Sequence, residues 1–250
     1  MITRKSNEEI EIMREGGRIT AHALQAVLRK AEPGMTLFDL ENIAGGEIRS
    51  RGGEPAFGRV KGYRFATCLN VNEGVVHGIP TGREIAEGDL LSVDLGTFYR
   101  GFNTDAAWTI YVGDRQRAPA DKLKFLAAGE RALEKAISAA VERNSVNDIS
   151  AGMQKVLEEF GYHPVETLVG HGVGRDLHED PPVPCLVLQE QSPKLSSGMV
   201  LAIEVIYTEG SSELILAEDG WTLATRDQSL SALFEHTVAI TRKGPIILTQ

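Results

Sequence analysis

Residues 90–112 read LLSVDLGTFYRGFNTDAAWTIYV, two apolar runs joined by a glycine-bearing segment. The segment predicts a tight turn between two antiparallel strands. Asp94 and Asp105 stand at equal distances from its centre, which falls between Tyr99 and Arg100. A hairpin that folds symmetrically about this centre would place the two carboxylates opposite each other, with Cβ atoms roughly 5 Å apart. Because like charges at that distance repel, a cation that neutralises both is the simplest interpretation.

Two further acids lie in apolar runs of the same kind, Glu204 within residues 200–207 and Glu235 within residues 234–240. Any one of the four acids, taken alone, could lie on an edge strand and face water. Together they favour a buried cluster, since two divalent cations balance the charge of four carboxylates. The sequence therefore predicts a two-metal site.

Three histidines lie in glycine-rich segments: His77 in NEGVVHGIP, residues 72–80, and His171 and His178 in GHGVGRDLHEDPP, residues 170–182. Imidazole beside several carboxylates suits Co, Mn, Fe or Zn better than calcium or magnesium. Histidines that do not bind metal could move protons or hold an oxyanion. The alternative is that these segments are surface turns with incidental histidines.

Length and composition restrict the classes of protein that are open. The chain has 250 residues, 42% hydrophobic and 24% charged, which suits one large domain or two fused halves. It contains no run of about 20 apolar residues, which argues against a membrane span. The formal net charge of −9 argues against stable nucleic-acid binding. Because the start lacks a secretory signal and only two cysteines are present, we expect a cytoplasmic protein.

The apolar spacing predicts four helices. They are expected over residues 7–30, after Thr36, from Pro119 through Val141, and from Ser145 to Gly161. Strands are expected at residues 90–95, 107–112, 200–207 and 234–240.

The first and second halves of the sequence contain an internal repeat. A shift of 109 positions aligns the helix caps at Thr36 and Ser145, the acid three residues after each cap, and a later glycine. We therefore expect an α+β fold of two pseudo-symmetric halves, with a central antiparallel sheet and helices outside. The whole chain, 1–250, would form one catalytic domain, with halves of roughly 1–115 and 116–250.

These motifs together resemble those of the type I methionine aminopeptidases, metal-dependent hydrolases with the pita-bread fold. The resemblance spans nearly the whole chain. It rests on HGIP at 77–80, the aspartates at 94 and 105, GHGVG at 170–174, His178-Glu179, Glu204, and FEHTV at 234–238. It implies five metal ligands: Asp94, Asp105, His171, Glu204 and Glu235. Of these, Asp105 and Glu235 would bridge two ions, His171 and Glu204 would bind one, and Asp94 the other.

The resemblance also implies an activity. The family removes the initiator methionine from nascent polypeptides, through attack of a water or hydroxide that bridges the two ions on the first peptide bond. Glu204 would accept a proton, His178 would polarise the carbonyl and stabilise the oxyanion, and His77 would contact the scissile amide. The implied partners are the N-terminal peptides of new proteins, with transient ribosome contact, no membrane, no stable nucleic-acid binding and a monomeric state.

The methionine pocket matches the family in part. Tyr63, Cys68 and Trp221 match residues that line or border it, whereas Leu177, Ile206 and Leu233 depart from the family pattern. These departures keep open a related hydrolase of altered specificity, such as a proline-directed aminopeptidase. A non-catalytic pita-bread protein that binds partners is the third reading. His236 follows Glu235 on a strand, so we expect its side chain to point to the opposite face.

Overall fold

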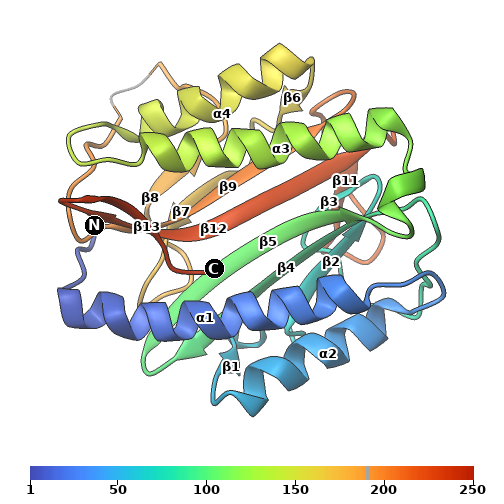
Figure 1. Ribbon diagram of the computed structural model, residues 1–250, viewed down its shortest axis with the longest axis horizontal. Helices are drawn as coiled ribbons and strands as arrows, with labels where there is room; N and C mark the ends of the chain where they lie inside the picture. Colours follow the sequence, from blue (N-terminus) through green and yellow to red (C-terminus); the bar gives the residue numbers. More distant parts are fainter. Residues whose placement is uncertain (190–191) are drawn as a thin grey trace.

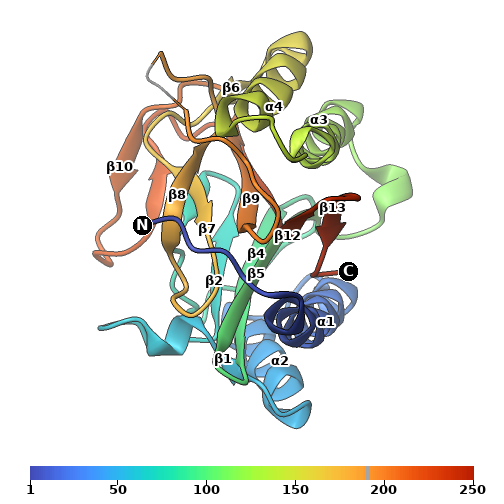
Figure 2. The same cartoon turned by 90° about the vertical axis from the view of Figure 1, so that its left-hand side faces the viewer.

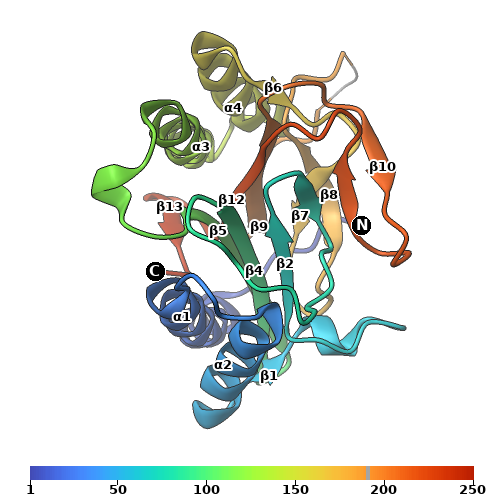
Figure 3. The same ribbon diagram turned by 90° about the vertical axis from the view of Figure 1, so that its right-hand side faces the viewer.

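The structure is a computed structural model that describes residues 1–189 and 192–250. Within these ranges a ten-stranded sheet carries four helices on one of its sides, with β10 on the other (Figures 2 and 3). Every strand pair of this sheet is antiparallel. The helices are α1 (Asn7–Lys30), α2 (Leu37–Ser50), α3 (Ala120–Ala139) and α4 (Val146–Phe160), with 3-10 turns η1 (Phe57–Arg59) and η2 (Arg115–Arg117).

The sheet joins strands from both ends of the chain. Its main path runs β1-β4-β5-β12-β9-β7-β8, with β2 beside β4, β13 beside β12 and β6 beside β9. Its strands are β1 (Glu54–Pro55), β2 (Thr67–Val71), β4 (Leu90–Tyr99), β5 (Phe102–Tyr111), β6 (His163–Pro164), β7 (Val169–Gly172), β8 (Glu179–Pro184), β9 (Val200–Thr208), β12 (Ser231–Thr241) and β13 (Gly244–Ile247). A second, three-stranded sheet contains β3 (Gly74–Val76), β10 (Leu214–Leu216) and β11 (Leu223–Thr225).

The helix starts are confirmed at their caps. Ser6 and Glu9 form a capping box at the start of α1, and boxes at Thr36 and Ser145 begin α2 and α4. Each box satisfies two backbone N–H groups that a helix start leaves unpaired. The third helix ends at Ala139, before the predicted Val141. The Asn144 side chain donates to the carbonyl of Ala139 (2.9 Å), one of the carbonyls that a helix end leaves without an intrahelical partner.

The predicted hairpin of β4 and β5 forms, but its predicted register is wrong. Arg100 and Gly101 occupy the turn, both with positive φ (48° and 90°), so the turn centre lies one residue later than expected. Two-residue hairpin turns often have a positive φ at both of their central residues. Asp94 therefore pairs with Ala107 rather than with Asp105, and the two aspartates are diagonal neighbours on one face.

Corresponding features recur in the two ends of the chain. β1 follows α2 and pairs with β4, and β6 follows α4 and pairs with β9. Isolated bridges join Thr36 to Glu84 and Ser145 to Lys194, at the start of each of these helices. Figure 1 shows α1 and α2 over one end of the sheet and α3 and α4 over the other. These parallels support two related halves; a division near residue 115 stays a prediction.

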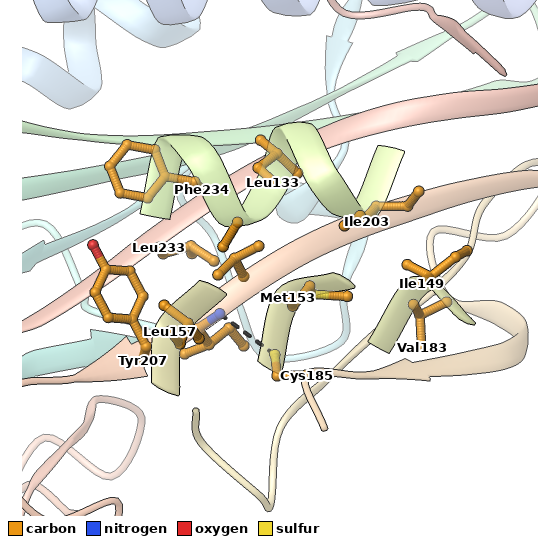
Figure 4. Packing of buried hydrophobic residues seen from close by; sticks show 14 of the residues in the cluster. Leu133, Ile149, Met153, Leu157, Val183, Cys185, Ile203, Tyr207, Leu233 and Phe234 are labelled. Carbon is orange, nitrogen blue, oxygen red and sulfur yellow. Dashed lines mark hydrogen bonds between the residues drawn. The ribbon is translucent and has the colours of Figure 1, made fainter. Parts of the chain in front are cut away.

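The largest hydrophobic core lies between the sheet and α3 and α4. Figure 4 shows Phe234 and Leu233 of β12 and Tyr207 of β9 close to these helices. The Cys185 thiol lies in this core and accepts a hydrogen bond from the backbone N–H of Ile206 (3.4 Å). This packing fixes β9 and β12, the strands that carry Glu204 and Glu235.

None of the helices in the described ranges has the length and apolarity that crossing a membrane requires.

The contact of α3 with the sheet gives a test of this packing. A Cβ at Gly129 would lie 2.4 Å from the Phe234 ring and 2.7 Å from Tyr207. Gly129→Ala should therefore lower the free energy of unfolding by about 1–3 kcal/mol. Gly46, in α2, has open space around it, so Gly46→Ala should raise that energy by about 0.4–1 kcal/mol. Urea unfolding of both variants measures the difference, and a stabilising Gly129→Ala would contradict the packing.

Candidate metal centre

Three of the predicted site residues lie in one row across the centre of the sheet. Asp94 of β4 pairs with Ala107 of β5, Ala107 pairs with Glu235 of β12, and Glu235 pairs with Glu204 of β9. Directly paired residues point to the same face, and neighbouring strands are about 4.8 Å apart. The three carboxylates therefore share one face, and the small side chain of Ala107 leaves space between them.

Asp105 and His171 join this row from the adjacent pair positions. Asp105 lies two residues from Ala107, and His171 pairs with Ala202, two residues from Glu204. Because side chains two apart on a strand point the same way, both face the row. Ligand atoms of Asp105, His171 and Glu235 all lie within 4.8 Å of one another, and these three side chains are buried.

The pKa values of the four carboxyl groups are raised. Burial, followed by the charges of Asp105 and Glu204, raises the pKa of Asp94 well above its usual range. Burial raises the pKa of Asp105 to about 7, and burial with the charge of Asp105 raises the pKa of Glu204 to about 8. Burial, followed by the charges of the three other acids, raises the pKa of Glu235 well above its usual range. No positively charged side chain of the described residues is among the causes of these shifts, so the charge of the cluster is not offset by an ion pair there.

Some carboxylate oxygens of this cluster lack hydrogen-bond partners. The buried atoms Asp94 Oδ1, Asp105 Oδ1 and Glu235 Oε1 have no hydrogen-bond partner in the described part of the chain. Buried polar atoms in folded proteins are almost always paired. Unpaired carboxylate oxygens beside an imidazole form a donor set that suits transition-metal cations, so these residues fit bound metal.

His171 has the protonation state of a metal ligand. Burial lowers its pKa to about 4, so the imidazole is neutral at neutral pH. Its Nδ1–H donates to the carbonyl of Gly172 (2.9 Å), since a carbonyl can only accept. The lone pair is then on Nε2, and the hydrogen bond fixes the ring as outer partners of metal-binding histidines do.

His77 and His178 line the same cavity but are more open to solvent. Partial burial lowers the pKa of both, and the charge of His178 adds to the effect on His77. The His178 ring packs at 4.4 Å from that of His171. His77 follows β3 and has a positive φ of 60°, which is unusual for a non-glycine residue. In this conformation its side chain lines the cavity.

One cavity of about 240 Å³ contains all these groups. All the predicted metal-binding, catalytic and pocket residues line it. Its apolar end is formed by Tyr63, Cys68 and Trp221, with the rings of Tyr63 and Trp221 edge to face at 5.1 Å. The Tyr63 hydroxyl donates to the carbonyl of Thr67 (2.6 Å), so the phenol turns its apolar ring to the cavity.

Sequence reasoning missed part of this lining. Phe57 and Val60 also face the cavity, from the 3-10 turn and the residue that ends it. No spacing pattern marked them, because an irregular segment has no periodicity. Of the three departures from the family pattern, Leu177 lines the cavity, whereas Ile206 and Leu233 pair with each other in the core between β9 and β12.

The opposite face of the sheet holds His236, as expected. Its Nδ1 is 3.0 Å from the Thr249 hydroxyl, and its ring lies near Trp108.

Thr237, the next residue along β12, connects the strand of Glu235 to the strand of Asp105. Its hydroxyl accepts from the backbone N–H of Asp105 and donates to the carbonyl of Asp105, both at 2.8 Å.

The chain is similar to known metallopeptidases. Residues 11–242 match metallopeptidase family M24. The chain is 40% identical over 254 residues to the methionine aminopeptidase of Aquifex aeolicus, covering 98% of this chain and 97% of that relative. The crystal structure of the methionine aminopeptidase of Thermotoga maritima matches with a TM-score of 0.96 and 39% identity over the whole of both chains. The pita-bread fold that the resemblance implied is thereby confirmed.

A more distant likeness concerns the fold alone. The prolidase of Pyrococcus furiosus matches with a TM-score of 0.79 and 24% identity, over 99% of this chain and 65% of the prolidase.

The raised carboxyl pKa values predict a pH-dependent stability of the metal-free protein. A group whose pKa is raised by folding stabilises the protein at low pH, and that stability is lost as pH rises through the folded pKa. With Asp105 at about 7 and Glu204 at about 8, the melting temperature in chelator should fall between about pH 5 and about pH 8. Added Mn²⁺ should raise it most at the upper end, since protons and metal compete for the same oxygens.

Thermal melts of two variants test this profile. Glu204→Gln removes one titrating group and should flatten it, whereas Glu209→Gln, at an exposed position just after the same strand, should leave it unchanged. A metal-free melting temperature that does not depend on pH would contradict the clustered carboxylates.

Proposed function

The chain belongs to metallopeptidase family M24, and from that premise we propose that it is a methionine aminopeptidase. Such an enzyme removes the initiator methionine from the N-terminal peptides of new proteins. One observation carries the proposal: five candidate ligands, two histidines and an apolar end line a single cavity.

The divalent metal that the family uses would be held by Asp94, Asp105, His171, Glu204 and Glu235, which all line the cavity. When bound, the ions supply Lewis-acid activation of a water nucleophile and an anchor for the free α-amine of the substrate. The identity of the ions, Co, Mn, Fe or Zn, depends on availability.

The protein's own side chains perform the remaining steps. Glu204 accepts the proton that the attacking water gives up. His178 donates a hydrogen bond to the carbonyl oxygen of the first peptide bond, where negative charge develops. His77 contacts the amide nitrogen and assists departure of the amine. The methionine side chain lies among Tyr63, Cys68 and Trp221, which exclude water from that end.

We also propose a monomeric, cytoplasmic enzyme that meets its substrates by transient contact with the ribosome. The candidate ligands, both histidines and the apolar end of the cavity all belong to this chain, so the proposed chemistry calls on no residue of a second subunit.

The activity is tested with the tripeptide Met-Ala-Ser and protein loaded in turn with Co, Mn, Fe or Zn. We expect release of free methionine with at least one of these ions and none in chelator. No release with any of them would refute the proposal.

A peptide panel separates the alternatives that the sequence left open. Peptides that vary the first residue test methionine preference, which Leu177 in the cavity could relax by about 1–3 kcal/mol. Cleavage restricted to peptides with proline second would favour the proline-directed reading instead. Purified protein that holds no metal at neutral pH would favour the non-catalytic one.

The role of His178 predicts a separation of catalysis from metal binding. His178→Ala should lower kcat by about 100-fold or more while metal content, measured by elemental analysis, stays at the wild-type level. His22→Ala, on the exposed side of α1, is the matched control and should keep full activity. An unchanged kcat in His178→Ala would move the oxyanion contact to another group.

A further inference from the structure

A buried ion pair lies beside the loop that carries His178. The Lys5 ammonium is 2.6 Å from the Glu179 carboxylate, and only 5% and 8% of these side chains are exposed. Lysine is among the residues least often fully buried, and then it is paired. The two residues are 174 positions apart in sequence, so the contact is a long-range connection within the fold.

Lys5 belongs to the segment that leads into α1. Figure 2 shows the chain running from its N terminus beside β8 towards α1. The backbone N–H of Lys5 donates to the carbonyl of Gly198 (2.7 Å), and Arg4 Nε donates to the carbonyl of Ser197 (2.9 Å). The hydroxyl of Thr3 donates to the same carboxylate of Glu179. The segment is therefore fixed against the end of the molecule that holds β7 and β8.

Glu179 connects this segment to the site. It is the first residue of β8, directly after His178, and its other oxygen accepts from the backbone N–H of Asp176 (3.3 Å). Burial by itself raises the pKa of Glu179, but hydrogen bonds from Lys5 and Thr3 bring it below the usual value, so the carboxylate is ionised.

The ion pair packs directly on the loop. A Cβ at Gly174 would lie 2.6 Å from Lys5 Nζ and 2.7 Å from Glu179 Oε1. The carbonyl of Gly174 also accepts from the backbone and side chain of Asn103 (2.7 and 3.1 Å). Asn103 lies on β5, two residues before Asp105, so the loop is held between the metal centre and the Lys5–Glu179 pair.

His178 depends on this backbone for its position. In residues 1–189 and 192–250 its ring makes no hydrogen bond to a protein group. The ring lies 4.4 Å from that of His171, centre to centre, and lines the cavity. Its orientation is therefore set by the conformation of residues 174–179.

From this arrangement we propose that Lys5 and Glu179 form a positioning pair, which holds the backbone at 174–179 so that His178 meets the substrate carbonyl. The inference rests on the proposed function of His178. Loss of the pair should lower kcat through His178 and leave the metal ligands in place, because a displacement of about 1 Å at a reacting group can cost 100-fold in rate.

The test is a double-mutant cycle between Lys5→Met and His178→Ala, with Met-Ala-Ser as substrate. Lys5→Met alone should lower kcat by about 10- to 100-fold, with KM within about threefold and metal content unchanged. In the His178→Ala background the same change should have almost no further effect, since coupled residues are not additive. Arg18→Met, which removes a positive charge at an exposed position of α1, should keep full activity, and Lys5→Arg should restore most of it.

Two outcomes would overturn the pair. One is wild-type kcat in folded Lys5→Met; the other is a full additional loss in the His178→Ala background, which would indicate a general structural role. If Lys5→Met fails to fold by circular dichroism, the cycle is run with Glu179→Gln, which keeps the shape of the side chain, and the same outcomes decide.

A second readout keeps the inference separate from the proposed function. The imidazole ¹⁵N–¹H signals of His178 are identified by their loss in His178→Ala. They should shift in Lys5→Met and not in Arg18→Met, whether or not the wild-type protein cleaves Met-Ala-Ser. Inactive wild-type protein would refute the aminopeptidase, whereas unmoved His178 signals would refute the positioning pair.

Discussion

Repulsion among four carboxylates at the centre of one sheet is the constraint on which this structure depends. Asp94, Asp105, Glu204 and Glu235 share a face among apolar strands and have raised pKa values. All but Glu204 carry an oxygen without a hydrogen-bond partner in the described part of the chain. A sheet that only had to be stable would place apolar side chains there. The cluster persists because cations can neutralise it, and the same cations supply the chemistry of the family.

The fold brings this cluster together across the junction of its two halves. One hairpin supplies Asp94 and Asp105, and the pair of β9 and β12 supplies Glu204 and Glu235. Direct pairing between β5 and β12 is short, from Glu235 with Ala107 to His236 with Ala106. The two hydrogen bonds between Thr237 and Asp105 extend this contact and fix the acids of one half relative to those of the other.

The sequence predicted what depends on local chemistry. Capping boxes and glycines located the helices, and acids in apolar runs, joined to the family resemblance, pointed to the residues that the cavity gathers. The hairpin register was missed, because it depends on whether Arg100 adopts a positive φ, which composition alone does not determine. Phe57 in the cavity wall and Lys5 against Glu179 were also missed, because both contacts arise from tertiary packing.

The most direct test of the central claim is anomalous diffraction from crystals grown with Mn²⁺, recorded for the wild-type protein and for Asp105→Asn. The carboxylate cluster predicts two anomalous peaks in the wild-type cavity, both next to Asp105 and Glu235, and loss or weakening of both in the variant. A wild-type cavity without anomalous density, its carboxylates hydrogen-bonded to one another instead, would contradict the account.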